Sequence, residues 1–426
     1  MGVVLSACSA RPGPPSASAA SATYVSGPVA HTSAEPSSAA PTANTGEYDA
    51  VLGQSSTKAA ASSPTRPEST ATSTPAPPPR TVTILGSGDV LLHPQLWAQA
   101  KADAAETGRG AYDFGPIFAD VAGPVAAVDV AICELETPVA APGGPLSGWP
   151  RFDVPPQVLA ALKQIGYDSC TTASNHTLDQ GASGVARTLN ALDAAGLKHT
   201  GSARSAAEAA QPLVITTGNG VRVGQLAYTF GFNGLERPAG KDWMANLIDV
   251  PQILAAARRV KAAGADIVVL SLHWGTEYDH LATATQRALA RTLLASPDID
   301  LILGDHAHVV QPMQRIDGEW VVYGMGNQVA RHANPVEASR AGIMPVITFT
   351  EGRDGAFRAT SARIVPTWMQ FTPDLRLIDL AAALADPDLP DSLRTQYQAT
   401  VTRIRSSVDA YGEQVPVAGA SVPAGG

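Results

Sequence analysis

Short apolar runs alternate with segments of helical spacing from residue 81 to about residue 364. Apolar runs of about four to eight residues are typical of buried strands, and apolar residues three or four apart are typical of helices. The runs predict strands at 81–85, 129–133, 167–173, 213–216, 222–229, 266–272, 300–303, 320–323, 343–350 and 357–364. The spacing predicts helices at 117–128, 155–165, 183–195, 251–263, 285–295 and 393–411. This alternation predicts an α/β fold, and its two consecutive strand pairs predict that not every strand is parallel.

Polar side chains follow six of the predicted strands, at the point where each strand ends. They are Asp89, Glu136, Asn175 with His176, His273, His306 with His308, and Asn327. Ligands of open α/β sheets bind beyond the carboxyl ends of the strands, so we expect these groups to share one cavity. Alone, each residue is more simply a helix cap, a turn former or a satisfied core histidine. As a set of nitrogen and oxygen ligands without cysteine, they predict a site for Mn, Fe or Zn.

The same residues lie in motifs that resemble the CapA family of bacterial poly-γ-glutamate (capsule) synthesis proteins. The motifs are Gly-Asp-Val-Leu-Leu at 88–92, Leu-Glu-Thr-Pro at 135–138, Ser-Asn-His-Thr-Leu-Asp-Gln-Gly at 174–181, Ser-Leu-His-Trp-Gly-Thr-Glu-Tyr at 271–278, Gly-Asp-His-Ala-His-Val-Val-Gln-Pro at 304–312 and Tyr-Gly-Met-Gly-Asn at 323–327. The family is similar to the calcineurin-like metallophosphoesterases. The resemblance therefore implies a four-layer α/β/β/α sandwich with a site for two divalent metal ions at one edge.

The resemblance also implies a role for each residue of the site. Asp89 and His308 would bind the first metal ion, Glu136 would be the bridging carboxylate, and Asn175, His273 and His306 would bind the second ion. His176 would act as general acid or transition-state stabiliser. Asp179 would orient His176, or alternatively cap the helix that begins near residue 183.

Three features depart from the pattern of these relatives. Metallophosphoesterases usually begin with Asp-x-His, whereas here His93 follows Asp89 by four positions. Glu134 and Asp305 stand where CapA-like proteins often have Asn and His, and both add negative charge beside the site. Trp274 and Tyr278 flank His273, where they could shape the mouth of the cleft, but packing is the simpler expectation for both.

The ends of the chain differ in composition from the middle. Residues 1–8 resemble a truncated lipoprotein signal whose lipobox, Leu5 to Cys8, would carry a lipid anchor. Residues 9–79 are rich in Ser, Ala, Pro and Thr and are expected to form a disordered tether. We expect the CapA-like domain at 80–367 and a C-terminal helical extension with a flexible tail at 368–426. The expected location is extracytoplasmic, at the membrane.

Composition and charge exclude some classes of protein. The 426 residues include 45% hydrophobic residues and carry a formal net charge of −9, without a basic stripe, so we expect no nucleic-acid partner. Cys8, Cys133 and Cys170 are too few and scattered for a disulfide framework. Cys133 and Cys170 lie in predicted strands and are expected to act as small apolar residues.

Three hypotheses for function follow. The first is a cell-surface, metal-dependent hydrolase or transferase in the biosynthesis of poly-γ-glutamate, capsule or another envelope polymer, with an anionic polymer as substrate. The second is a non-catalytic partner of a membrane polymer synthase that holds the chain in the same cleft. The third is a secreted nucleotidase-like phosphatase, against which the added acids Glu134 and Asp305 weigh.

Overall fold

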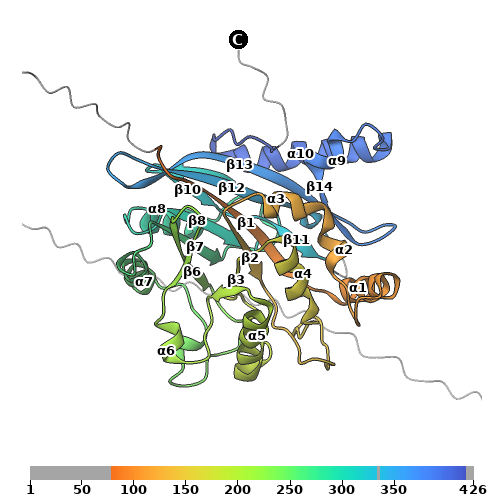
Figure 1. The fold of residues 1–426 in the computed structure, drawn as a ribbon, viewed down its shortest axis with the longest axis horizontal. Coiled ribbons are helices and arrows are strands. Elements are labelled where there is room, and N and C mark those ends of the chain that lie inside the picture. The colour runs from red at the N-terminus through yellow and green to blue at the C-terminus, as the bar shows by residue number, and fades with distance from the viewer. Residues whose placement is uncertain (1–77, 333–335, 419–426) are drawn as a thin grey trace, which may run out of the picture. The chain divides into compact units, whose positions relative to one another are not determined.

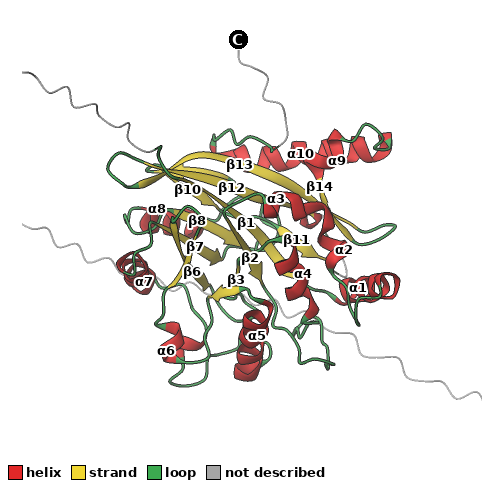
Figure 2. Cartoon of the chain, viewed as in Figure 1, coloured by secondary structure: helices red, strands yellow, loops and turns green. Residues whose placement is uncertain are grey.

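The computed structural model describes residues 78–332 and 336–418. The expected lipobox and nearly all of the expected tether lie outside the described residues. Within the described part, the strands form two sheets surrounded by helices (Figures 1 and 2). The first sheet has the order β14 (Arg376–Asp379), β13 (Phe357–Gln370), β12 (Ala341–Glu351), β1 (Thr81–Leu91), β2 (Val130–Leu135), β3 (Ser169–Thr171) and β4 (Lys198–Thr200), with β11 (Asn327–Ala330) paired to β1. The second has the order β5 (Leu213–Thr216), β6 (Arg222–Thr229), β7 (Ile267–His273), β8 (Leu301–Asp305), β10 (Glu319–Val322) and β9 (Met313–Ile316).

Both sheets have a parallel centre. Strands β1 to β4 pair in parallel in chain order, as do β6, β7, β8 and β10 in the second sheet. Strands β5, β9, β12, β13 and β14 pair antiparallel at the edges. The expectation of mixed sheets is therefore confirmed. Parallel pairing brings the carboxyl ends of neighbouring strands to one edge of each sheet, which is the condition for a shared site.

Three apolar clusters define the layers. The helices α1 (Pro94–Thr107), α2 (Gly115–Phe118), α3 (Ala122–Ala126), α4 (Gln157–Ile165) and α5 (Gly181–Ala195) pack on one face of the first sheet. Its other face packs against the second sheet through a cluster that includes Ile84, Ile132, Val269 and Leu303. The helices α7 (Val250–Ala262) and α8 (Ala284–Leu294) cover the far face of the second sheet. The predicted four-layer α/β/β/α sandwich is confirmed.

Several elements differ from those expected. The predicted helix at 117–128 is divided into α2, a 3-10 turn (Ala119–Val121) and α3. Pro124 lies in the first turn of α3, where its missing N–H costs nothing, so the chain begins a new helix there. The pattern missed α1, α6 (Ala206–Ala209) and the short strands β4, β9, β11 and β14.

The part of the chain after residue 367 supplies more than the expected helices. Strand β14 pairs with the end of β13, and α9 (Leu380–Ala385) and α10 (Asp391–Val408) follow it. Tyr397, Ile404 and Val408 of α10 join the apolar cluster between the sheets. Figure 1 shows α9 and α10 running beside β13 and β14. This segment therefore completes one end of the core.

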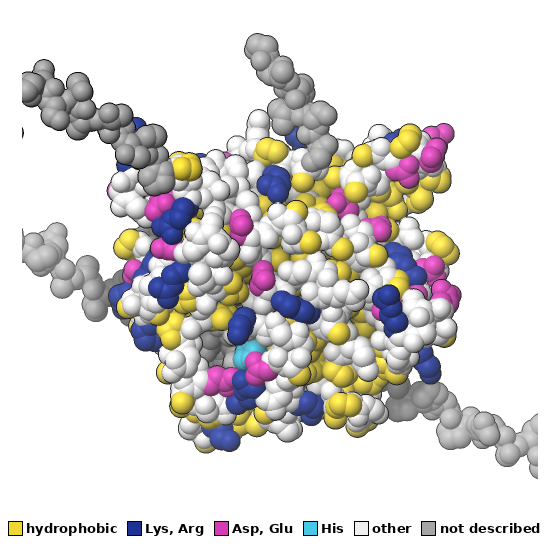
Figure 3. All heavy atoms as spheres, viewed as in Figure 1, with side chains coloured by type: hydrophobic (Ala, Val, Ile, Leu, Met, Phe, Trp, Pro, Cys, Tyr) yellow, Lys and Arg dark blue, Asp and Glu magenta, His cyan; other side chains and the backbone are white. Residues whose placement is uncertain are grey.

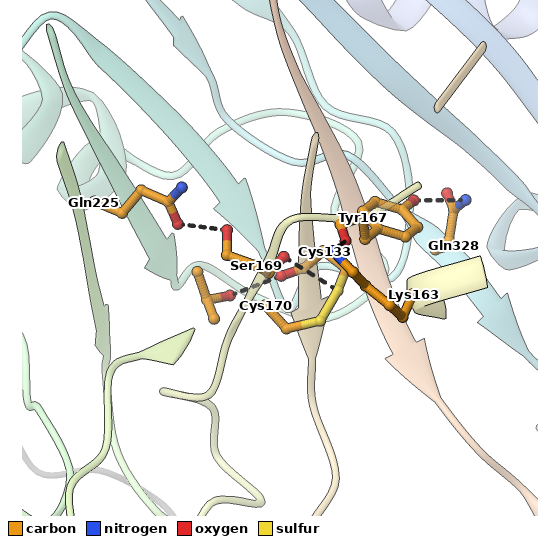
Figure 4. Close-up of a disulfide and its surroundings, with 8 residues drawn as sticks. Cys133, Lys163, Tyr167, Ser169, Cys170, Gln225 and Gln328 are labelled. Atoms are coloured by element: carbon orange, nitrogen blue, oxygen red, sulfur yellow. Dashed lines mark hydrogen bonds between the residues drawn. A yellow bond between two sulfur atoms is a disulfide. The ribbon is translucent and has the colours of Figure 1, made fainter. Parts of the chain in front are cut away.

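Cys133 and Cys170 form a disulfide, so the expectation that they are unpaired core residues is wrong. They are directly paired residues of β2 and β3. Figure 4 shows this bond beside Ser169, whose hydroxyl donates a 2.7 Å hydrogen bond to Gln225 Oε1 of the second sheet. The pairing was invisible in the sequence because 37 positions separate the two residues, and only the β2–β3 register makes them neighbours.

The surface is mixed in charge and no described helix is both long and apolar enough to cross a membrane. On the face shown in Figure 3, Lys and Arg side chains are interspersed with Asp and Glu. That face carries no extended basic patch.

Replacing Glu319 with glutamine is expected to raise stability at high pH. Burial and the nearby Asp300 raise the pKa of Glu319 to about 7, and Glu319 Oε2 has no hydrogen-bond partner among the described residues. The pKa of the Glu319 carboxyl is higher in the folded protein than in the unfolded chain. The folded protein therefore loses stability as pH rises from about 4.5 to about 7. The melting temperature of Glu319→Gln should therefore exceed that of the parent by more at pH 8 than at pH 5. An equal difference at both pH values would contradict this account.

Candidate metal centre

The polar residues of the strand ends meet in one buried cluster. Asp89 lies in β1, Glu136 just beyond β2, and Asn175 and His176 beyond β3, all in the first sheet. His273 ends β7, and His306 and His308 follow β8, in the second sheet. All seven side chains are buried. The site therefore lies where the carboxyl ends of both sheets converge.

An irregular stretch of β1 presents Asp89 to the cluster. The pairing register of β1 shifts between Gly86 and Asp89 on the β2 side, and again after Asp89 on the β11 side. Such bulges re-aim side chains at functional edges. Gly88 is required here, because a Cβ atom at this position would lie 1.7 Å from the carbonyl oxygen of Gly326. The glycine of the Gly-Asp motif thus permits the close approach that sets Asp89 in place.

Two ligand groups share Asp89. Ligand atoms of Asp89, Glu134 and His273 lie within 4.8 Å of one another, and so do those of Asp89, Glu136 and His308. A third group joins Glu277 to His306 and His308. Asp89 belongs to both buried groups, and the bridging role that the resemblance implies for Glu136 stays a prediction. Asn175 contacts this set through its Oδ1, 3.0 Å from His273 Nε2.

The polar atoms of the cluster are left without protein partners. Among the described residues, the orphaned buried atoms include both carboxylate oxygens of Glu134 and Glu136, Nδ1 of His273 and of His306, and Oδ1 of Asp305. An unsatisfied buried polar atom costs about 1–3 kcal/mol, so such atoms are rarely gathered without a ligand. Carboxylates and imidazoles together suit Mn, Fe or Zn. The donor set therefore fits bound divalent cations.

The electrostatics of the cluster are those of crowded like charges. Burial, and then the neighbouring Asp89, raise the pKa values of Glu134 and Asp305 well above their usual range. Burial lowers the pKa of His308, but Glu136 and Asp89 offset this and bring it to about 10. Burial lowers the pKa of His306 to about 4. A bound cation favours the carboxylate and neutral imidazole forms, and so relieves the repulsion among the acids.

Two residues orient His176 and His308. Asp179 Oδ2 lies 2.7 Å from His176 Nδ1 and also accepts the Phe152 N–H at 2.8 Å. Asp179 does not cap the following helix, because α5 begins after Gln180 without a side-chain cap. Asn327 Oδ1 lies 2.9 Å from His308 Nδ1. The polar residue that follows the predicted strand at 320–323 therefore also reaches the site. Burial lowers the pKa of His176, but Asp179 and Glu136 more than offset this, and the net pKa is raised.

The structure adds residues that the motifs did not assign to the site. The ring centroid of His332 lies 5.2 Å from that of His308 and 4.6 Å from that of His93. Glu134 is a ligand candidate rather than only a neighbouring charge. A signal for Glu134 was present, because residues two apart on a strand share a face and Glu136 was already assigned. His332 follows β11, a strand that the pattern missed.

The flanking aromatics divide into two roles. Trp274 is 2% exposed, and its indole N–H donates to the Tyr323 carbonyl at 2.9 Å, so it packs as expected. Tyr278 is 37% exposed, and its ring centroid lies 6.1 Å from those of His308 and His332, so it borders the site with part of its surface open.

The fold and this cluster together define an α/β/β/α sandwich with a buried cluster of acids and histidines at the ends of two sheets. Among solved structures, the chain is similar to the calcineurin-like phosphoesterase YfkN from Bacillus subtilis, with 15% identity and a TM-score of 0.41 over 77% of this chain and 100% of that one. It is also similar to a putative 5'-nucleotidase from Staphylococcus aureus, with 17% identity and a TM-score of 0.44 over 75% of this chain and 58% of that one.

Residues 83–332, more than half of the chain, match the family model described as bacterial capsule synthesis protein PGA_cap, and the chain belongs to this family. It is 32% identical to the capsule biosynthesis protein CapA of Bacillus anthracis over 41% of this chain and 42% of the relative. It is 28% identical to a probable polyglutamine synthesis accessory protein of Mycobacterium tuberculosis over 48% of this chain and 56% of the relative. The matches thus span about half of each relative.

Proposed function

We propose that this protein is a metal-dependent hydrolase or transferase that acts on poly-γ-glutamate or a similar polymer of the cell envelope. One observation carries the proposal: buried carboxylates and imidazoles without protein partners form two ligand groups around Asp89. Membership of the capsule synthesis family supports the class of polymer. The extra acids Glu134 and Asp305 disfavour a multiply charged phosphate and favour an amide or ester carbonyl at the centre.

The residues have distinct roles in this proposal. Asp89, Glu134, Glu136, Asn175, His273, His306 and His308 hold the metal ions, of which we propose two, as Mn, Fe or Zn. Bound ions of this kind supply an activated water near neutral pH and stabilise charge on the attacked group. His176, held by Asp179, donates a proton to the leaving group.

We also propose an extracytoplasmic location, with Cys8 as the lipid attachment site. The Cys133–Cys170 disulfide supports this location, because disulfides persist in oxidising compartments and are rare in the bacterial cytosol. A membrane synthase of the polymer would then be the natural neighbour of the protein.

The test of the reaction is a parallel assay of purified, metal-loaded protein. Poly-γ-glutamate should become shorter, or be transferred to an added amine, faster than bis-p-nitrophenyl phosphate is cleaved. His176→Ala should reduce the rate about a hundredfold at unchanged metal content, since general acids contribute roughly that much. His199→Gln, at a histidine in β4 paired with Asp193, is the matched control and should keep the parent rate. A metal-loaded protein that acts on neither substrate would refute the enzymatic role.

A second candidate function is that of a non-catalytic partner of a membrane polymer synthase. The mycobacterial relative is named an accessory protein, which favours this candidate. In cells, a His306→Ala/His308→Ala double variant that exports polymer at the parent level would support it. A loss of mature polymer in the same variant would favour catalysis.

A further inference from the structure

Two exposed aromatic rings border the metal centre. Among the described residues the exposed large hydrophobic side chains are Trp149, Phe230, Tyr278, Leu281 and Val336. Phe230 and Tyr278, here called the aromatic pair, are the two of these that contact histidines of the cluster. Large apolar side chains exposed beside a buried polar site mark a surface that binds a ligand.

Phe230 covers the side of the centre formed by the second sheet. It follows β6, and its N–H donates to the carbonyl oxygen of His273 at 3.0 Å. Its ring centroid lies 4.5 Å from that of His306, and its plane is within 6° of the plane of His273. The backbone bond fixes the start of the Phe230 loop, while Phe230 as a whole is 49% exposed. Phe230 therefore lies beside the site histidines and leaves about half of its surface open to solvent.

Tyr278 is held beside His308 by an unfavourable backbone conformation. Its φ of 64° lies in the left-handed region, which a bulky side chain rarely adopts. The conformation lets its N–H donate to the Ala307 carbonyl at 2.7 Å, between the two site histidines. Its ring centroid lies 6.1 Å from those of His308 and His332. Strain of this kind persists at sites where function, rather than stability, sets the geometry.

We propose that the aromatic pair binds a planar, uncharged amide link of the polymer and so places the carbonyl of that link at the metal centre. This inference rests on the proposed function and names the part of the substrate that the aromatic pair binds. Neither ring carries a charge, and the acid next to Tyr278, Glu277, repels free anions. Aromatic faces pack well on flat amide and methylene groups, with the negative carboxylates of the chain left outside in water.

The test measures equilibrium binding of a γ-glutamyl oligomer of one defined length by calorimetry. It uses the full, metal-loaded chain with His176→Ala as background, so that turnover is slow. Tyr278→Gly and Phe230→Leu should each weaken binding about fivefold, and together about twentyfold, at unchanged metal content. Tyr278→Phe should bind as the background does, because the ring rather than the hydroxyl makes the contact.

The melting temperature of the Tyr278→Gly variant shows whether the strained conformation of Tyr278 serves binding or the stability of the fold. Tyr278→Gly should melt no lower than the parent, because glycine adopts a positive φ without cost. Asp317→Gly is the matched control, since Asp317 also has a positive φ of 53° but lies in the turn between β9 and β10. It should leave binding unchanged. A lower melting temperature for Tyr278→Gly would show that Tyr278 serves the fold, and would overturn the inference.

The remaining outcomes distinguish the two proposals. If the background protein and both aromatic variants bind the oligomer with equal affinity, the aromatic pair does not bind the polymer. The proposed function is then unaffected. A background protein that binds no γ-glutamyl oligomer overturns the amide assignment and removes poly-γ-glutamate as the substrate of the proposed function. Adenosine monophosphate is the second probe: if it binds and only its affinity depends on the two rings, the pair grips a nucleobase and the amide assignment is wrong.

Discussion

Replacing Asp89 with asparagine is expected to reduce bound metal from about two ions per purified chain to one or none. The reason is geometric, because Asp89 is the only residue common to both buried ligand groups that the described residues form. Asparagine keeps the size of the side chain and an oxygen for the His306 N–H, which Asp89 Oδ1 accepts at 3.0 Å. The measurement is elemental analysis of parent and variant after identical metal loading.

The same variant should have a smaller effect on stability once the metal is removed. In the metal-free protein Asp89 faces the buried acids Glu134 and Asp305, which disfavour its charge, and His308, whose Nδ1 lies 3.0 Å from Asp89 Oδ2 and favours it, so the two effects of losing the charge offset each other. With metal, the parent gains stability from binding and the variant gains less. Asp354→Ala, in an exposed turn where Asp354 pairs with Arg358, is the control and should bind metal as the parent does. Parent protein that holds no metal after loading would end the case for the centre.

Loss of the disulfide is expected to lower the free energy of unfolding by about 3 kcal/mol. The bond closes a loop across a sequence separation of 37, and such a cross-link restricts the unfolded chain. The comparison is between Cys133→Ala/Cys170→Ala and the oxidised parent, both in a Cys8→Ser background so that only one pair can form. Urea unfolding with and without reductant is the measurement.

The two proteins should respond differently to reductant. The parent unfolded with reductant should refold to the lower stability of the double variant, whereas the variant should be unaffected. An unfolding midpoint of the parent that is the same in both conditions would show that the cross-link contributes nothing. Metal content should be retained in the double variant, because neither cysteine is a candidate ligand.

Most of the element order follows from local pattern. Strands β5 and β6 have the predicted bounds, and α5, α7 and α8 begin and end within two residues of expectation, because period and caps are local properties. Helix α1 was missed although its signals were present, with Pro94 in the first turn and Gly108 as a left-handed cap. The short strands β4, β9, β11 and β14 carry weak apolar patterns, and each is defined by its pairing with one neighbour, which is β3, β10, β1 and β13 respectively.

The residues of the site were predictable from the sequence where a polar side chain directly follows a predicted strand. Asp89, Glu136, His273 and His308 gather because parallel pairing brings those ends together. Glu134 was predicted as a charge beside the site and not as a ligand, since strand β2 was predicted to stop at Cys133 and in fact continues to Leu135. Glu277 and Phe230 come from loops, for which period carries no information.

The sequence by itself determined which strand ends carry acids, amides and imidazoles, and in what order. These are local facts, set by period and by residue type. Tertiary structure alone decided that Asp89 is shared by both buried ligand groups, that Cys133 meets Cys170 and that Tyr278 lies beside His308. Each of these depends on which distant strands become neighbours and on where a register shifts, and such long-range pairings are chosen by the packing of the whole core.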